Sequence, residues 1–181
     1  MLKRSLLTVA VASLLVGCAA LQPYIAPPPV DKGQPPSVID AYAAPSIRPG
    51  DTWMIFLKAE DPEGDMKSVA AVLWQAGVGY YPTEVIMLKP EEGKQFSGYF
   101  YLQTPVDFTL NWDEFDLYLY VRDAQGNRAQ PVKLPLRFDM AARQIVPEKW
   151  QEAANNRIAA LMFNIESSQR YNRGGNDRDF N

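Results

Sequence analysis

The sequence predicts an all-β sandwich of about seven antiparallel strands, preceded by a tether and followed by one C-terminal helix. Three observations support this prediction. From residue 37 to residue 139 the dominant hydrophobic period is two, and turn residues interrupt it at short intervals. The 15 prolines among 181 residues disfavour a mainly helical chain, because proline breaks helices. The composition, 47% hydrophobic and 22% charged, provides enough apolar material for one globular core.

The first segment, residues 1–17, has the pattern of a secretory signal peptide. Two basic residues, Lys3 and Arg4, precede an apolar run, and this order is typical of export signals. The run is too short to span a bilayer comfortably as a permanent helix. We therefore expect the mature protein to lie outside the cytoplasm.

The only cysteine of the chain, Cys18, directly follows this run. Leu15-Val16-Gly17-Cys18 resembles the lipobox of bacterial lipoproteins. This resemblance implies cleavage before Cys18 and lipid attachment to its thiol. An unpaired thiol is a liability in an oxidising compartment, so lipidation explains why this one is tolerated. The alternative is a free or buried cysteine behind a simple secretory signal.

A lipidated Cys18 would anchor the protein to a membrane without spanning it. One acyl chain anchors only marginally, whereas two or three hold a protein stably. Residue 19 is alanine rather than aspartate, which resembles the pattern of lipoproteins sent to the outer membrane. The expected location is the cell envelope, at the outer membrane, facing the periplasm or the cell surface.

Charge and residue content exclude several classes of function. Without Lys3 and Arg4 the 18 basic residues become 16, against 21 acidic residues, so the mature net charge is −5. Such a chain is a poor candidate for binding nucleic acid, which selects basic surfaces. The chain has no histidine, which removes the commonest general base and zinc ligand. We expect no enzyme and no cofactor other than the covalent lipid.

Residues 18–36 form the expected tether, with six prolines in "AALQPYIAPPPVDKGQPP". Proline-rich chain favours extended polyproline II, although a disordered linker would tether equally well. The sandwich is expected over residues 37–139. Its strands are predicted at residues 52–59, 66–75, 83–88, 95–103, 115–123 and 131–138.

Alternation assigns the inward side chains of these strands. In "FDLYLYVRD", Phe115, Leu117, Leu119 and Val121 are expected to face the core. Pro135 cannot donate a ladder hydrogen bond, so its strand is predicted at a sheet edge.

Two stretches give the sandwich a specific resemblance. "LYVRDAQGN" (119–127) resembles the F strand and F–G turn of bacterial immunoglobulin-like and fibronectin type III-like domains. "LKAEDPEGDMKSV" resembles their strand B, B–C turn and strand C, with Trp74 as the candidate core tryptophan. The resemblance implies an immunoglobulin-like fold without the antibody disulfide. It also implies adhesion, spacing or binding, and seldom catalysis.

Residues 147–171 change period and predict an amphipathic α-helix, followed by a disordered tail at 172–181. Its apolar stripe would pack on the outer face of a sheet, over Tyr118 and Tyr120. Alternatively, the stripe would bind another envelope protein through residues such as Ile158 and Leu161. The stripe comprises Trp150, Ala154, Ile158, Leu161, Met162 and Ile165.

Two loop regions are candidate sites. Asp61, Glu63 and Asp65 have the alternate spacing of calcium ligands, with Asp123 and Asn127 approaching from another loop. Pro62 and Gly64 already explain this stretch as a tight turn, so calcium is the alternative interpretation and no metal is the expected one.

Tyr80, Tyr81 and Trp112 are loop aromatics suited to stacking on a sugar or a peptide. The other interpretation is that these rings fold back onto the ends of the sandwich. Asp113, Glu114 and Asp116 are expected to be solvated charges rather than a hydrolase pair.

The function expected from the sequence is a membrane-anchored, non-enzymatic binding or structural module. Two alternatives remain: a carbohydrate-binding or hydrolytic surface protein that uses the loop aromatics, and an accessory subunit of a secretion, pilus or efflux assembly. The expected partners are the membrane, through the lipid, and either an envelope protein or a polysaccharide.

Overall fold

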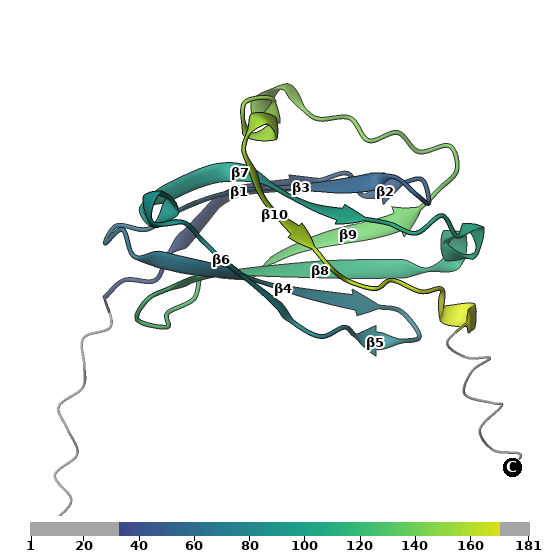
Figure 1. Cartoon of the computed structure of the whole chain (residues 1–181), viewed down its shortest axis with the longest axis horizontal. Coiled ribbons are helices and arrows are strands. Elements are labelled where there is room, and N and C mark those ends of the chain that lie inside the picture. The colour runs from purple at the N-terminus through teal and green to yellow at the C-terminus, as the bar shows by residue number, and fades with distance from the viewer. Residues whose placement is uncertain (1–32, 171–181) are drawn as a thin grey trace, which may run out of the picture. The chain divides into compact units, whose positions relative to one another are not determined.

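A computed structural model of the chain describes residues 33–170, which fold into two packed β-sheets (Figure 1). The expected signal peptide, the lipidation site Cys18, tether residues 18–32 and the tail at 172–181 lie outside the described residues. Tether residues 33–36 have no regular secondary structure. No helix within residues 33–170 is long and apolar enough to cross a membrane.

The first sheet has the strand order β1-β3-β7-β10, and the second has the order β2-β9-β8-β4-β5, with β6 also paired to β4. The first sheet comprises β1 (Ser37–Ala43), β3 (Thr52–Glu60), β7 (Gln95–Gln103) and β10 (Arg157–Leu161). The second comprises β2 (Ser46–Ile47), β4 (Met66–Gln75), β5 (Gly79–Tyr80), β6 (Glu84–Met87), β8 (Glu114–Asp123) and β9 (Val132–Phe138).

This arrangement confirms the predicted immunoglobulin-like sandwich. The strands matched to C, F and G are β4, β8 and β9, which are neighbours in the second sheet, whereas the strand matched to B is β3 in the first. Two pairings depart from the antiparallel expectation, since β2 pairs parallel with β9 and β10 pairs parallel with β7. The ten strands of the described chain exceed the predicted seven because β2 and β5 are two-residue segments and β10 comes from the C-terminal region.

The core lies between the sheets, where the predicted alternation is confirmed. The inward-facing side chains of β8, from Phe115 to Val121 at every second position, are at most 1% exposed. Pro135 lies in β9, whose outer side pairs only with the two-residue β2 at Arg137 and Phe138. The predicted edge position therefore holds only for residues 132–136 of β9, which include Pro135, because β2 lies outside the last two residues of the strand.

The buried tryptophan of the core is Trp53, not Trp74 as predicted. In β4 the fully buried side chains lie at every second position, at Val69, Ala71 and Leu73. Trp74 lies at an intervening position and is only half-buried. Trp53 is fully buried in β3, and its indole N–H donates to the carbonyl of Ala44 at 2.8 Å.

The predicted α-helix over residues 147–171 is wrong. This region forms two 3₁₀ turns, η3 (Glu148–Trp150) and η4 (Ala153–Asn155), then β10 and an extended segment that ends in a short helical turn at 168–170. From Leu161 onward the burial alternates strictly, with Leu161, Phe163 and Ile165 inside. The few apolar positions fit a helical period of about 3.6 residues as well as a strand period of two. Pairing with the edge of β7 favours the strand.

The 3₁₀ turns cover the outer face of the first sheet. Trp150 packs on Phe56 with ring centroids 5.5 Å apart, and Ala153 completes this small cluster. The sequence predicted that the C-terminal region covers the outer face of a sheet. It placed this contact over Tyr118 and Tyr120, which belong to the second sheet, whereas the 3₁₀ turns cover the first. These two tyrosines instead remain half-buried on the second sheet, with the Lys133 ammonium 5.9 Å from the Tyr118 ring centroid.

We call residues 157–170 the C-terminal strap, because they connect the two sheets (Figure 1). β10 adds to the first sheet beside β7. Beyond it, the Met162 amide donates to the Glu84 carboxylate at 2.7 Å, and the Gln75 side chain donates to the Glu166 carbonyl at 2.8 Å. Glu84 and Gln75 belong to the second sheet, so the strap closes one side of the sandwich.

The buried strap residues are expected to contribute strongly to stability. Leu161→Ala removes a side chain that is 2% exposed, so the free energy of unfolding should fall by about 3 kcal/mol. Met162→Ala is the matched control, because Met162 is adjacent but 78% exposed, and should change the free energy by less than about 0.5 kcal/mol. Denaturant unfolding of both variants measures the difference. Equal effects would contradict the packing described for the strap.

Candidate functional site

The strands run lengthwise, so the loops gather at two ends of the sandwich (Figure 1). The turn at residues 61–65 joins β3 to β4 at one end, which we call the acidic end. β5 and η2 (Phe108–Trp112) lie at the other, which we call the aromatic end, because β5 pairs with the last residues of β4 and η2 directly precedes β8. β4 has ten residues, so the two ends are about 30 Å apart.

The acidic end brings together the three predicted calcium candidates. Carboxylate oxygens of Asp61, Glu63 and Asp65 all lie within 4.8 Å of one another. Asp61 is 2% exposed, and its Oδ1 accepts hydrogen bonds from the amides of Glu63 at 2.8 Å and Gly64 at 3.2 Å. These bonds form the tight turn that the sequence predicts, and Gly64 completes it with a φ of 77°.

Asp123 adds a further negative charge to this turn, as expected for a residue of the neighbouring loop. Partial burial raises the pKa of the Asp65 carboxyl above its ordinary value, and the charges of Asp61, Asp123 and Glu63 raise it further. Asp123 is buried, and both of its carboxylate oxygens accept hydrogen bonds from Asn127, from the amide at 2.8 Å and the side chain at 2.7 Å.

At the aromatic end, Tyr80 and Trp112 are 73% and 80% exposed. Neither ring folds back onto the sandwich, so both side chains are available for stacking. Phe108, 60% exposed on the same 3₁₀ turn as Trp112, joins them. Sequence reasoning missed Phe108, although its position four residues before Trp112 in an unassigned loop was a usable signal.

Tyr81 plays a different part from Tyr80. Its hydroxyl donates to the Gln75 side chain, and its ring lies edge-on to Phe163 with centroids 6.2 Å apart. Burial raises the pKa of the Tyr81 hydroxyl above its ordinary value. Tyr81 therefore holds the strap against the second sheet and offers little surface to a ligand.

The two strap residues named as a partner surface also face inward. Leu161 is 2% exposed, and Ile158 packs against the core with its side chain beside Gly98. These two residues therefore pack within the chain rather than forming a surface for another envelope protein.

The carboxylates near Trp112 are engaged in structural contacts, and the expectation of a solvated charge is wrong for Asp113. Asp113 is 3% exposed and accepts a hydrogen bond from the Ser168 amide at 3.2 Å. Glu114 pairs with Arg137 at 2.7 Å, and Asp116 pairs with Lys133 at 2.9 Å. These contacts attach the strap and join neighbouring strands.

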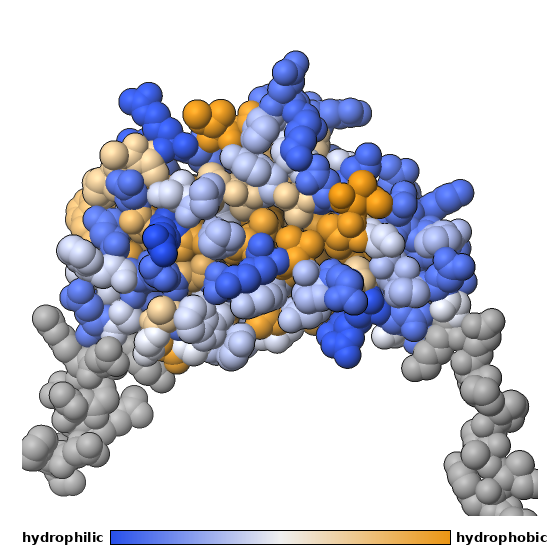
Figure 2. Space-filling view, turned by 180° about the vertical axis from the view of Figure 1, so that it is seen from behind, coloured by the Kyte–Doolittle hydropathy of each residue, from blue (hydrophilic) through white to orange (hydrophobic). Residues whose placement is uncertain are grey.

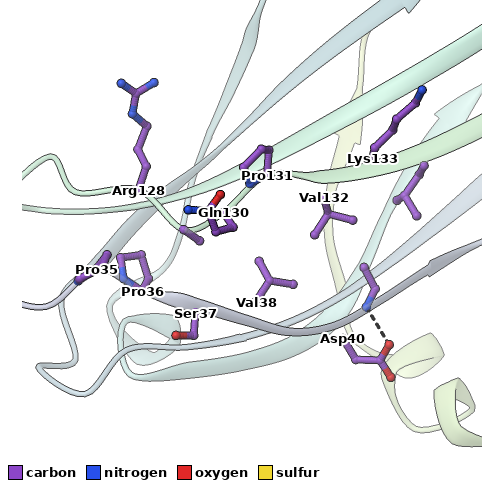
Figure 3. A pocket seen from close by; sticks show the side chains of 13 residues that line it. Pro35, Pro36, Ser37, Val38, Asp40, Arg128, Gln130, Pro131, Val132 and Lys133 are labelled. Carbon is purple, nitrogen blue, oxygen red and sulfur yellow. Dashed lines mark hydrogen bonds between the residues drawn. The ribbon is translucent and has the colours of Figure 1, made fainter.

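A groove of about 600 Å³ lies between β1 and β9, and sequence reasoning missed it. Val38 and Val132 face one another across it, with Pro131 directly before β9 (Figure 3). Seen from behind, the molecule shows a band of hydrophobic surface between hydrophilic side chains (Figure 2). Pro131 and Pro135 remove amide donors from the open edge of β9, which disfavours strand addition there.

Comparisons with known proteins give only distant structural likenesses. No protein-family model and no curated protein matches the chain. The chain is similar to a mutant SrpA adhesin from Streptococcus sanguinis at 13% identity and a TM-score of 0.39, over 59% of this chain and 56% of that chain. It is also similar to a CARDB domain from Pyrococcus furiosus in complex with di-metal ions, at 11% identity and a TM-score of 0.32, over 57% of this chain and 87% of that chain. Both TM-scores are below 0.5, so neither likeness supports an argument about function.

Asp107 is expected to stabilise the turn that presents Phe108 and Trp112. Its Oδ1 accepts hydrogen bonds from the Thr109 hydroxyl at 2.7 Å and the Thr109 amide at 3.0 Å, and its Oδ2 lies 3.0 Å from the Arg170 guanidinium. These contacts hold the pKa of Asp107 below its ordinary value of 3.8. At pH 7, Asp107→Ala should lower the free energy of unfolding by about 1 kcal/mol.

The pH dependence of this loss follows from the lowered pKa. The contribution of the Asp107 carboxylate is fully present above its unfolded pKa, and it disappears as the pH falls through the folded pKa. Denaturant unfolding at pH 7 and pH 3 should therefore show a smaller difference at pH 3. Asp107→Asn, which keeps a capping oxygen but loses the charge, should cost less than Asp107→Ala. Equal costs for the two variants would contradict the capping role.

Proposed function

We propose that this chain is an envelope lipoprotein that acts as a non-enzymatic binding or structural module. The observation that carries the proposal is the sequence Leu15-Val16-Gly17-Cys18, placed directly after a basic and then apolar leader. A proline-rich stretch and a folded β-sandwich follow it, which is the order expected of an anchored module.

The place where the described chain enters the sandwich distinguishes its two ends. The described chain begins at Gly33, and the amide of Gln34 donates to both oxygens of Glu63 at 3.2 Å, at the acidic end. The tether would therefore join the acidic end. Tyr80 and Trp112 lie at the opposite end, about 30 Å farther along the strands. In this proposal the aromatic end, rather than the end at which the described chain begins, contacts the ligand.

The chemistry of the chain supports a role without catalysis. The sequence has no histidine. The carboxylates closest in sequence to the exposed Trp112 form hydrogen bonds or ion pairs with Ser168, Arg137 and Lys133. A general acid or base must be able to reach a substrate proton, and these groups are already used to hold strands and strap together.

The aromatic end favours a polysaccharide as the ligand class. Aromatic side chains with exposed faces can stack on sugar rings, and Tyr80 and Trp112 are the most exposed aromatic residues of the described chain. An envelope protein partner, as in an accessory subunit, is the competing form of the proposal.

Lipid attachment is tested by Cys18→Ser. In a bacterial host fed labelled palmitate, the wild-type chain should carry the label and sediment with membranes. The variant should lose both properties, because its side chain is no longer a thiol. A labelled, membrane-bound Cys18→Ser variant would overturn the anchoring proposal.

Ligand binding is tested by pull-down on insoluble peptidoglycan and outer-membrane polysaccharide. Trp112→Ala and Tyr80→Ala should each reduce retention at least several-fold, whereas Met162→Ala, an exposed apolar control outside β5 and η2, should not. Retention unchanged in both aromatic variants would exclude stacking. Crosslinking in intact cells that captures one protein at fixed stoichiometry, lost in the same variants, would favour the protein partner instead.

A further inference from the structure

The acidic end contains oxygen atoms that the protein itself does not satisfy. Asp61 Oδ2 and Asp65 Oδ1 are buried and accept no hydrogen bond from residues 33–170. The Asp61 side chain is oriented by the bonds to its Oδ1, and the residue is only 2% exposed. A buried carboxylate oxygen without a donor is costly, so such an atom calls for a ligand that compensates its charge.

The charge of this region is also uncompensated. We call Asp61, Glu63, Asp65 and Asp123 the acidic cluster. None of the ion pairs formed within residues 33–170 includes a member of the cluster. The fold therefore holds four carboxyl groups together at one end without a lysine or arginine partner among these pairs.

We propose that the acidic cluster binds a divalent cation, with calcium as the preferred ion. Asp61 and Asp65 supply the two orphan oxygens, and Glu63 supplies a third carboxylate. One oxygen of each of these three residues lies within 4.8 Å of an oxygen of the other two. Asp123, whose oxygens are already bonded to Asn127, contributes negative charge rather than a ligand. Water completes the coordination shell on the exposed side.

The donor atoms favour calcium over other metals. Carboxylate oxygens are hard ligands that suit calcium and magnesium, and the cluster has no histidine or thiolate to select zinc or copper. Calcium accepts irregular oxygen geometries with six to eight ligands, whereas magnesium demands a near-ideal octahedron. The three carboxylates differ in burial, with Asp61 buried, Asp65 half-buried and Glu63 exposed, and such an irregular set suits the more adaptable ion.

The proposed ion would also act on the start of the domain. Glu63 accepts the Gln34 amide, and a side chain at Gly33 would clash with the Glu63 carboxylate. The described chain therefore enters the sandwich directly against one ligand of the site. A cation that holds Glu63 in place would stiffen the junction between the tether and the sandwich.

Thermal unfolding of the full chain in detergent tests the proposal, with calcium chloride added to protein first treated with EDTA. We expect a Kd of about 0.1–1 mM, as for extracellular calcium modules. Calcium at ten times Kd should raise the melting temperature by about 5 °C. Isothermal titration calorimetry with calcium alone measures the same Kd independently of unfolding.

Asp65→Asn separates a cation site from a merely acidic turn. The variant keeps the shape of the side chain and removes one charge. In EDTA it should melt at or above the wild-type temperature, because repulsion within the cluster is relieved. In calcium it should lose the increase. Glu114→Gln, at the aromatic end, is the matched control and should retain the full increase.

Three results would overturn the proposal. The first is a wild-type melting temperature that does not change up to 10 mM calcium, on the order of ten times the weakest Kd expected. The second is a calcium-dependent increase that is as large in Asp65→Asn as in the wild type. The third, an equal increase with magnesium, would overturn the preference for calcium.

Discussion

The packing of Leu161, Phe163 and Ile165 between the two sheets is the interaction on which the rest of the structure depends. Without the strap, β7 would be an edge strand of the first sheet, and the core beside it would face water. β10 pairs with β7, and the next residues enter the core and bond to the second sheet. The strap therefore both protects an open edge and joins the two layers.

The same strap organises the aromatic end. Its last residues contact the segment around η2, through the Ser168 amide on Asp113 and the Arg170 guanidinium on Asp107. Asp107 in turn caps the turn that carries Phe108 and Trp112. Exposure of large aromatic side chains therefore occurs on a supported turn. The buried middle of the sandwich provides stability. The exposed aromatic side chains and the acidic cluster lie at its two ends.

The two ends differ in chemistry. The acidic end concentrates uncompensated negative charge next to the start of the domain, and the aromatic end exposes apolar rings to solvent. Both features oppose stability when considered in isolation, because charge repulsion and exposed apolar area are unfavourable. The proposed ligand at the aromatic end and the proposed cation at the acidic end would each offset one of these unfavourable features.

Most of the sandwich could be predicted from the sequence because its strands are half-buried and alternate cleanly. Phe115 to Val121 show this best, since every second side chain faces the core. The C-terminal region could not be predicted this way. Trp150, Leu161 and Ile165 fit a helical stripe, yet Trp150 packs outside the first sheet while Leu161 and Ile165 pack inside the core. The apolar residues of this one sequence pattern therefore pack in two different places, the outer face of the first sheet and the core. The sequence pattern alone does not separate the two groups.

The candidate sites were predictable to different degrees. Spacing alone placed Asp61, Glu63 and Asp65 together, because a tight turn brings alternate residues to one side. Tyr80 and Tyr81 are adjacent in sequence, but strand geometry sends one ring to solvent and the other onto Phe163. Trp74 was misassigned for the same reason, since a shift of one residue moves a side chain to the opposite face.

Amide hydrogen exchange on the full chain tests the central role of the strap most directly. If the strap belongs to the cooperative core, the amides of β10 should exchange only through the same global opening as those of β3 and β7, with similar free energies of opening. Exchange of β10 through a separate, low-energy opening, while β3 and β7 stay protected, would contradict this account. In that case the sandwich would be stable without its strap.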